Sequence, residues 1–342
     1  MKCIVDHGSR NPGLMQRRNE LGALACKFRL LDLKSANQCQ APEVNVSKKH
    51  LLAVWFQQIR GPFLILAVAL SLLGIATAHW HGFGHFGHSL LLLAGVVLAH
   101  VSVNLFNEIA DYKSKIDENT VRTPFSGGSG MLQSGQTTIG LVIWAAYLAL
   151  LAAGAIGLYF CLTSGWPILF FMVCGALAIR FYTSHLAKWL IGEFVSGLTL
   201  GSFVVIGSHY ALSRFITPDI IYIAIVPGIL TALLLFLNEF PDAEADRQGG
   251  RRHLVIFFGK KKSAVIYACA VFLLFALIAA GPFILNIPYT VLIALSTLPL
   301  GVAAVFMTLK HHDHAARLVP AQGLNVALVI LTDLLLAVAY FL

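Results

Sequence analysis

The chain has 342 residues, of which 58% are hydrophobic and only 12% are charged, and its formal net charge is +8 at pH 7. Soluble globular domains carry about 25% charged residues and about 45–50% apolar ones, so this composition excludes an ordinary soluble enzyme, a disordered chain and a small disulfide-stapled domain. Together with a mean hydropathy of +0.78, it predicts a polytopic membrane protein.

Residues 1–50 are polar and of mixed charge, and they contain no apolar run long enough to span a membrane. The stretch Cys3–Leu24, CIVDHGSRNPGLMQRRNELGAL, resembles the start of the sirohydrochlorin cobaltochelatase family, whose metal-site histidine would match His7. Only this short stretch matches, and roughly 25 residues are too few to fold alone. We therefore interpret residues 1–50 as an N-terminal extension, either a fusion remnant or a mis-assigned start, and residues 51–342 as the membrane domain.

The remainder of the chain is a series of apolar segments separated by short polar loops. Each apolar segment must be a helix, because a chain inside a bilayer has to satisfy its own backbone hydrogen bonds, and the continuous apolar runs exclude a β-barrel. The prediction is an all-α protein with nine transmembrane helices at 61–79, 89–110, 138–162, 166–181, 190–212, 219–238, 263–282, 286–308 and 322–342.

The positions of the basic residues predict the orientation of these helices. From Lys48 onward, sixteen Lys and Arg residues fall in segments on one side of the predicted bundle, and only Arg214 falls on the other. Cytoplasmic loops carry the excess of Lys and Arg, so we expect a multi-pass protein of a prokaryotic inner membrane with a cytoplasmic N-terminus. This topology accounts for the basic net charge without a nucleic-acid partner.

The acidic residues are concentrated in two short clusters. Eight of the twelve acids beyond the extension lie in two windows, at 108–118 and 239–246, and both windows fall on the predicted cytoplasmic side. Acids at the edge of a membrane are costly and are candidates for function. The alternative is that they are solvated helix ends, where acids occur freely.

Within each cluster the polar residues lie on one face of a helix. Asn104, Asn107 and Asp111 follow the spacing i, i+3, i+7, with Asp117 in the next loop. The second cluster has the spacing i, i+4, i+8, in Asn238, Asp242 and Asp246. Carboxylate and amide oxygens suit Mg²⁺, which commonly binds through one or two carboxylates together with substrate phosphates.

Basic residues beside both clusters favour a phosphate-bearing ligand. Among them, Arg247 directly follows Asp246 and is the residue that we expect to reach a diphosphate. Any of the basic residues could instead serve only as a determinant of topology. The full set is Lys113, Lys115, Arg122, Arg247, Arg251 and Arg252.

Both clusters resemble the motifs of the UbiA superfamily of intramembrane prenyltransferases. The stretch NLFNEIADYKSKID, Asn104–Asp117, resembles the first motif, and NEFPDAEADRQGGRRHLVIFFGK, Asn238–Lys260, resembles the second. The six-residue step from Asp111 to Asp117 and the run TPFSGGSG, Thr123–Gly130, are most similar to the dihydroxynaphthoate branch of the menaquinone pathway. Departures from the family pattern are Glu108 in place of Asp, Pro241 in place of Arg, and a short loop after Tyr182.

The resemblance implies a bundle of nine helices around a central cavity and a Mg²⁺-dependent transfer of a polyprenyl group from its diphosphate to an aromatic acceptor. It implies Asp111 and Asp242 as catalytic residues, and it assigns metal binding to Asn107, Asp111, Asp117, Asp242 and Asp246. Diphosphate binding is assigned to Asn107, Asn238, Arg247, Lys113 and Arg122, and the acceptor pocket to Asn104, Tyr182, Lys188 and His100.

Several readings stay open. His100 could line the cavity or be a hydrogen-bonded core histidine, and Glu193 could be an acid at a helix start or an acceptor contact. The acceptor could instead be 4-hydroxybenzoate, homogentisate, a porphyrin or a glycerol phosphate lipid. A cation transporter is the alternative from another class, and it is disfavoured because the acids lie on one side only. Membrane lipid is the expected surrounding in every case.

Overall fold

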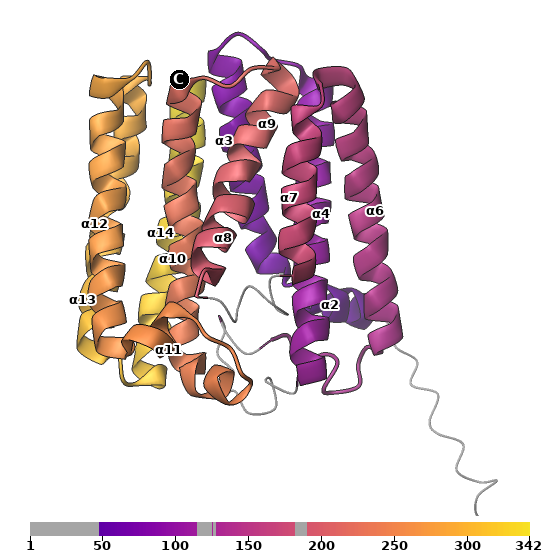
Figure 1. The fold of residues 1–342 in the computed structure, drawn as a ribbon, viewed down its shortest axis with the longest axis vertical. Helices are drawn as coiled ribbons and strands as arrows, with labels where there is room; N and C mark the ends of the chain where they lie inside the picture. The colour runs from indigo at the N-terminus through magenta and orange to yellow at the C-terminus, as the bar shows by residue number, and fades with distance from the viewer. Residues whose placement is uncertain (1–47, 115–124, 126–127, 182–189) are drawn as a thin grey trace, which may run out of the picture. The chain divides into compact units, whose positions relative to one another are not determined.

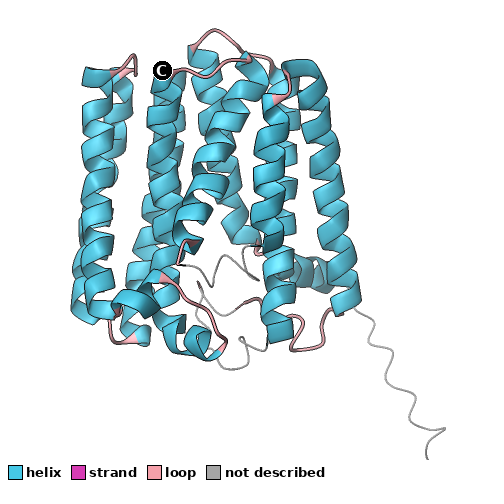
Figure 2. Ribbon diagram, viewed as in Figure 1, coloured by secondary structure: helices cyan, strands magenta, loops and turns pink. Residues whose placement is uncertain are grey.

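The computed structural model describes residues 48–114, 125, 128–181 and 190–342. Residues Leu52–Leu342 form one compact unit. Over the described ranges, the regular structure is helical and contains no strand (Figure 2). The extension 1–47 and four predicted site residues, Asp117, Arg122, Tyr182 and Lys188, lie outside the described residues.

Long helices run side by side between the two ends of this unit, with short α11 at one end (Figure 1). In chain order the helices are α2 (Lys48–Gln58), η1 (Gly61–Phe63), α3 (Leu64–Trp80), α4 (Phe86–Ser114), α6 (Ile139–Ser164), α7 (Pro167–Phe181), α8 (Gly192–Ser196), the π-helical turn η3 (Gly197–Ser202), α9 (Phe203–Ser213), α10 (Pro218–Gln248), α11 (Leu254–Phe258), α12 (Lys260–Ile284), the 3₁₀ helix η4 (Tyr289–Thr297), α13 (Leu298–His311) and α14 (Ala315–Phe341).

Eight helical segments among the described residues are long and apolar enough to cross a membrane. They coincide with eight of the nine predicted spans. The remaining prediction, 166–181, coincides with α7, whose 15 residues fall short of the length that a membrane crossing usually needs. The segment predicted at 219–238 continues to Gln248 as α10, so the second acidic cluster lies on the helix itself.

Local sequence signals explain where several helices begin and end. Pro62 and Pro218 stand in the first turns of η1 and α10, where a missing backbone N–H costs nothing. The hydroxyl of Thr138 accepts a hydrogen bond from the Leu141 amide and caps α6. Gly165 follows α6 with a φ of 121°, a conformation that favours glycine and ends the helix.

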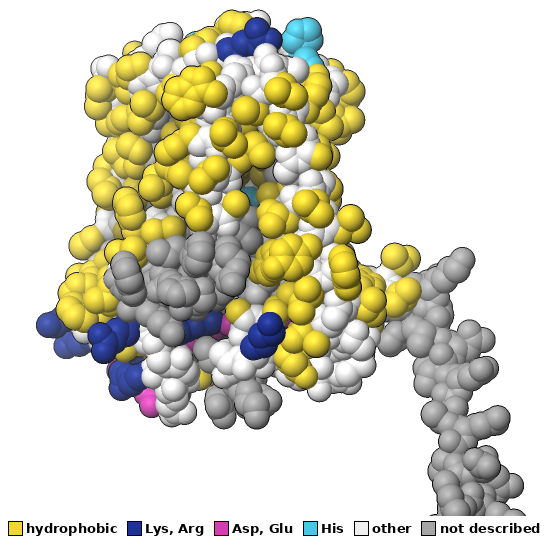
Figure 3. Space-filling model, turned by 45° about the vertical axis from the view of Figure 1, so that its right-hand side comes forward, with side chains coloured by type: hydrophobic (Ala, Val, Ile, Leu, Met, Phe, Trp, Pro, Cys, Tyr) yellow, Lys and Arg dark blue, Asp and Glu magenta, His cyan; other side chains and the backbone are white. Residues whose placement is uncertain are grey.

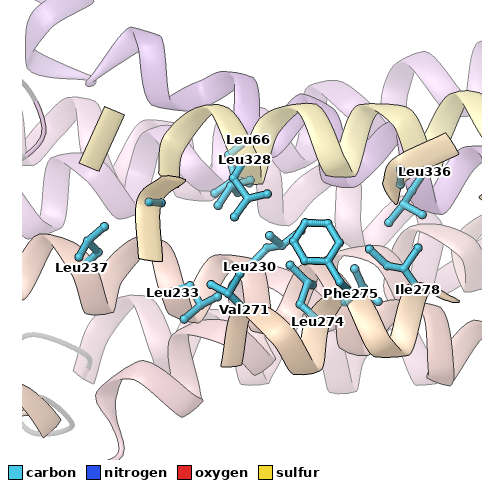
Figure 4. Close-up of a cluster of buried hydrophobic side chains, with 14 of the residues drawn as sticks. Leu66, Leu230, Leu233, Leu237, Val271, Leu274, Phe275, Ile278, Leu328 and Leu336 are labelled. Carbon is cyan, nitrogen blue, oxygen red and sulfur yellow. The ribbon is translucent and has the colours of Figure 1, made fainter. Parts of the chain in front are cut away.

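The largest hydrophobic core lies between α3, α10, α12, α13 and α14. Leu230, Leu233, Val271, Leu274 and Phe275 interdigitate there with leucines of α3 and α14 (Figure 4). Burying such side chains stabilises the protein by about 1.5–3 kcal/mol each in water. Between membrane helices, close packing supplies more of the stabilisation than the hydrophobic effect does.

Glycines allow α8 and η3 to pack closely on α10. A Cβ on Gly201 would approach the carbonyl oxygen of Pro227 to 2.7 Å, and a Cβ on Gly197 would meet the carbonyl oxygen of Gly228. The spacing Gly-x-x-x-Gly lets two helix backbones approach in this way. The contact fixes the N-terminal end of α8, which carries Glu193, relative to α10.

Charged side chains are segregated along the bundle. In the view of Figure 3, Lys and Arg gather at one end and hydrophobic side chains cover the middle, with a smaller basic group at the opposite end. Following the chain from helix to helix, every described Lys and Arg side chain lies at the end of the bundle that holds α11, except that of Arg214. The described part of the chain therefore has the segregation that the sequence predicts.

Candidate active site

Two helices bring the acidic clusters to the same end of the bundle. Asp111 lies in the last turn of α4, and Asp242 and Asp246 lie in the last turns of α10. All three side chains are shielded, since Asp246 is buried and the other two are partly buried. Two polar stripes therefore lie on helices, as their spacing predicts: Asn104, Asn107 and Asp111 on α4, and Asn238, Asp242 and Asp246 on α10.

Arg251 joins the two acidic clusters. Its guanidinium forms an ion pair with Asp111 through Nη2, and its Nη1 donates to Asp246 Oδ1 at 2.9 Å. The chain reverses after α10 at Gly250, whose φ is 76°, and this turn carries Arg251 back over the helix end. A partly buried cation therefore lies between the carboxylates of α4 and α10, where positive charge is favoured.

His253 lies on the other side of Asp246. Its Nε2 is 3.3 Å from Asp246 Oδ2, and its Nδ1 is 3.4 Å from Glu239 Oε2. The next residue, Leu254, donates its backbone N–H to Glu193 Oε1 at 2.7 Å. The segment 251–254 is thereby held against α8 and α10 by polar contacts.

Glu108 holds the loop that follows the first cluster. Its carboxylate is fully buried and accepts hydrogen bonds from the Ser129 amide at 3.1 Å and the Ser129 hydroxyl at 2.5 Å. Arg60 Nη2 lies 3.8 Å away. Because both oxygens of this carboxylate contact Ser129, Glu108 holds the loop against α4, one turn before Asp111.

The asparagines of the two stripes differ in their surroundings. Asn104 donates to the carbonyl oxygen of Ile59 at 2.9 Å, and Asn238 Oδ1 accepts from Gln322 Nε2 at 3.1 Å. Asn107 is partly buried one turn before Asp111. Asn104 is therefore engaged in packing α4 against the segment after α2.

Two predicted diphosphate contacts are exposed. Arg247 has a side chain that is 60% exposed and pairs with Glu244 at 3.6 Å, on the outer side of α10. Lys113 is also exposed, in the last turn of α4. Among the described residues, Arg251 rather than Arg247 is the arginine that contacts both clusters.

An apolar cavity of about 360 Å³ lies between α4, α6, α7, η3 and α9. His100 forms part of its wall, and its Nδ1 is hydrogen-bonded to the Val96 carbonyl oxygen at 3.1 Å. Glycines and alanines make up much of the remaining wall, together with larger side chains such as Phe160 and Met172. His100 thus fits both readings of the sequence, since it is a buried, hydrogen-bonded histidine that also lines a cavity.

The model of the UbiA prenyltransferase family matches residues 64–329. This range begins with α3 and ends within α14. The chain belongs to the UbiA prenyltransferase family. It is thus a prenyltransferase and a multi-pass membrane protein.

Similar proteins of assigned function are prenyltransferases named for a naphthoquinone or a naphthoate acceptor. A 2-carboxy-1,4-naphthoquinone phytyltransferase of Synechocystis sp. is 21% identical over 300 residues, 84% of this chain and 92% of the relative. A 1,4-dihydroxy-2-naphthoate octaprenyltransferase of Bacillus subtilis is 29% identical over 187 residues, 53% of this chain and 58% of the relative. These relatives match the menaquinone branch that the motifs resemble.

Solved UbiA structures share the fold. A UbiA homologue of Aeropyrum pernix superposes with a TM-score of 0.64 at 16% identity, over 79% of this chain and 95% of the homologue. A homologue of Archaeoglobus fulgidus bound to DMAPP and Mg²⁺ gives a TM-score of 0.57 at 15% identity, over 83% and 99%. At these identities the likeness establishes the fold alone.

The central place of Arg251 and the contacts of His253 do not follow from the sequence patterns. Arg251 follows the end of α10 by three residues, and no periodicity carries its position across the turn. The pair Gly249-Gly250 was the available signal, since adjacent glycines after a helix indicate a chain reversal.

Proposed function

We propose that this protein transfers a polyprenyl group from its diphosphate to 1,4-dihydroxy-2-naphthoate or a close naphthoate, releasing diphosphate. The observation that carries the proposal is that Arg251 joins Asp111 and Asp246, so that the two acidic clusters form one site. The naphthoate acceptors of the curated relatives support the choice of acceptor.

The oxygen donors of the site fit Mg²⁺. Asp111, Asp242 and Asp246, with the amide oxygen of Asn107 and the sequence-assigned Asp117, provide the hard ligands that this ion prefers. The guanidinium of Arg251 between two of them indicates that the site stabilises a cation. Mg²⁺ bound there would neutralise the charge of a diphosphate and of the leaving group.

The chain's own residues would then hold the reacting groups. Arg251 would contact the diphosphate, together with the residues that the sequence motifs assign to it, Asn238, Arg247, Lys113 and Arg122. The allylic C–O bond breaks with its electron pair going to the diphosphate, and a ring carbon of the acceptor bonds to the allylic cation. The ring then loses a proton or its carboxyl substituent, which restores aromaticity. The apolar bundle shields the cation from water.

The apolar cavity suits the prenyl chain. His100 and Asp111 lie on the same helix, about 16 Å apart at 1.5 Å per residue, so a diphosphate at the acidic clusters would direct its chain along α4 into the cavity. His100 in the cavity wall and Asn104, which lies on α4 between His100 and Asp111, are proposed acceptor contacts together with the sequence-assigned Tyr182 and Lys188. Other aromatic acceptors and glycerol phosphate lipids are the alternatives.

In this proposal residues 51–342 form the catalytic domain. They lie in the inner membrane with the acidic clusters on the cytoplasmic side, and α7 is the ninth span around a central cavity. The alternation of helix directions supports a ninth crossing, because α7 returns the chain from the far end of α6 to the end where α8 begins (Figure 1).

The test uses purified protein, Mg²⁺, a prenyl diphosphate and a panel of acceptors, with the products identified by mass spectrometry. Asp111→Asn and Asp242→Asn should each abolish turnover while the protein still inserts into the membrane, and EDTA should abolish turnover of the unaltered protein. Glu244→Gln is the matched control, since Glu244 is an exposed acid of the same helix. Full activity in both Asp variants, or no response to EDTA, would contradict the mechanism.

A further inference from the structure

A second group of ligand-type side chains lies beside the acidic clusters, on the far side of Asp246 from Arg251. It consists of Glu193 at the start of α8, Glu239 on α10 and His253 before α11, and one ligand atom of each lies within 4.8 Å of the others. All three residues are at least nine-tenths buried, with exposed fractions of 3%, 9% and 4%.

The atoms that face the centre of this group have no hydrogen-bond donor among the described residues. Glu193 Oε2 and Glu239 Oε2 are both buried without one, and neither ring nitrogen of His253 makes a hydrogen bond. Burying a carboxylate oxygen without a donor or a cation is costly. The cluster therefore requires positive charge, supplied by a metal ion, by an imidazolium at His253 between Glu239 and Asp246, or by a proton shared between the two carboxyl groups.

The atoms that face away from the centre lie beside polar partners. Glu193 Oε1 accepts from the Leu254 amide at 2.7 Å, and His253 Nε2 lies 3.3 Å from Asp246 Oδ2. A metal-ligating histidine usually directs its second nitrogen to a carboxylate, which fixes the tautomer and leaves the other nitrogen free for the metal. Asp246 is itself held by Arg251, so the outer contacts of the group are in place.

The spacing of one pair of inner atoms suits a small cation, and the ligand atoms of all three residues lie within 4.8 Å of one another. His253 Nδ1 and Glu239 Oε2 are 3.4 Å apart, and two ligands of one tetrahedral zinc ion lie about 3.3 Å apart when each bond is about 2.0–2.1 Å long. An imidazole nitrogen with two carboxylates favours borderline transition metals over Mg²⁺, which prefers oxygen ligands alone.

From these observations we propose that Glu193, Glu239 and His253 bind a transition-metal dication of the Zn²⁺ class, separate from the Mg²⁺ of the acidic clusters. The ion joins α8, α10 and the segment 251–254. Its role is structural: it holds the chain reversal that places Arg251 between Asp111 and Asp246. The proposal does not depend on which prenyl acceptor the enzyme uses.

The test measures zinc bound to the full-length protein in detergent, in excess Mg²⁺ so that the acidic clusters are occupied. One zinc per chain is expected after equilibration with ZnCl₂, and X-ray absorption should show one imidazole nitrogen among its ligands. Co²⁺ in place of zinc should give the absorption bands of a tetrahedral site with a nitrogen ligand.

Glu193→Gln, Glu239→Gln and His253→Asn should each weaken zinc binding by about tenfold or more, because each removes one of three protein ligands. Glu244→Gln, the matched exposed control, should bind zinc unchanged. Asp242→Asn should also keep its zinc while losing turnover, which separates this site from the proposed reaction. If a variant fails to fold, the X-ray absorption and Co²⁺ spectra of the unaltered protein decide the question.

Two results would overturn the proposal. Absence of stoichiometric zinc in the unaltered protein would mean that a proton, on His253 or shared between the two carboxyl groups, supplies the positive charge instead. Zinc that persists in all three variants would belong elsewhere, for example to the four histidines where α3 ends and α4 begins, His79, His81, His85 and His88.

Discussion

At the scale of single residues, two arginines near Asp246 have different surroundings. Arg247 directly follows this aspartate, and Arg251 lies five residues after it. Arg251 is 20% exposed and contacts carboxylates of two helices, whereas Arg247 is 60% exposed and contacts one acid of its own helix. An ion pair on a surface contributes about 0–1 kcal/mol, so the Arg247 pair contributes little. Arg251 is the residue that can exchange carboxylate partners for a diphosphate.

We predict that Arg251→Ala lowers kcat/KM by about 10²–10³-fold, because the loss of one group that stabilises developing anionic charge has an effect of this size. Arg251→Lys should recover part of the activity, since it restores the charge without the bidentate geometry. Arg247→Ala should have a smaller effect than Arg251→Ala. Turnover of a prenyl diphosphate at saturating acceptor measures all three.

The control for this series is Arg252→Ala, because Arg252 is the exposed neighbour of Arg251. Its backbone carbonyl, not its side chain, accepts a hydrogen bond from the Leu190 amide. Its activity should stay within about twofold of the unaltered protein. An Arg251→Ala enzyme that is as active as this control would show that the arginine serves only to pair the carboxylates.

Sequence reasoning reached the residues that lie on a regular helix and missed those that depend on a turn. The stripes through Asp111 and through Asp242 and Asp246 follow from helical spacing alone. The contacts of Glu193 and His253 with α10 depend instead on how α8 and α11 pack, and a one-dimensional spacing carries no information about that. The contact of Glu108 was equally unpredictable from spacing, since its partner Ser129 lies in a loop.

At the scale of elements, the crossing of α8 and η3 over α10 determines where Glu193 lies. Glycine within a helix is ordinarily about 1 kcal/mol less favourable than alanine. At Gly197 the helical φ of −59° would tolerate alanine, but an added Cβ would lie 3.0 Å from the Ala232 Cβ and against the Gly228 carbonyl. The glycine is therefore required by the close approach of two helices.

We predict that Gly197→Ala destabilises the protein by about 1–3 kcal/mol, the usual effect of overpacking, and lowers turnover because it displaces α8. Gly140→Ala should have the opposite sign, since nothing lies within 4 Å of a Cβ at that position of α6 and alanine favours the helix. Thermal unfolding in detergent measures both changes. A neutral or stabilising Gly197→Ala would contradict the close crossing.

The helices themselves were largely predictable, and their irregular parts were not. Apolar runs predict membrane helices because the bilayer requires them, and the observed α3, α4, α6, α9 and α12–α14 follow that rule. The π-helical turn of η3 and the extension of α10 by ten residues beyond its predicted end do not follow from hydropathy. Both occur where the helices carry or adjoin the site.

At the scale of the whole molecule, the segregation of charge depends on α7 crossing the membrane. A helix of 15 residues is about 22 Å long at 1.5 Å per residue, whereas the hydrocarbon core is about 30 Å thick. A short span is accommodated by local thinning of the bilayer or by its neighbours, at a modest cost. If α7 did not cross, the basic residues from Arg247 to Arg317 would lie on the opposite side from Arg60 and Lys113.

We therefore predict that Lys260 and Arg60 face the same compartment and that Gly82 and Arg214 face the other. Single cysteines introduced at these positions, in a background without the six native cysteines, can be tested with a membrane-impermeant maleimide on intact cells. Positions 82 and 214 should react, and positions 60 and 260 should react only after permeabilisation. Reaction at 260 but not at 60 in intact cells would mean that α7 does not span, because every helix after it would then be inverted.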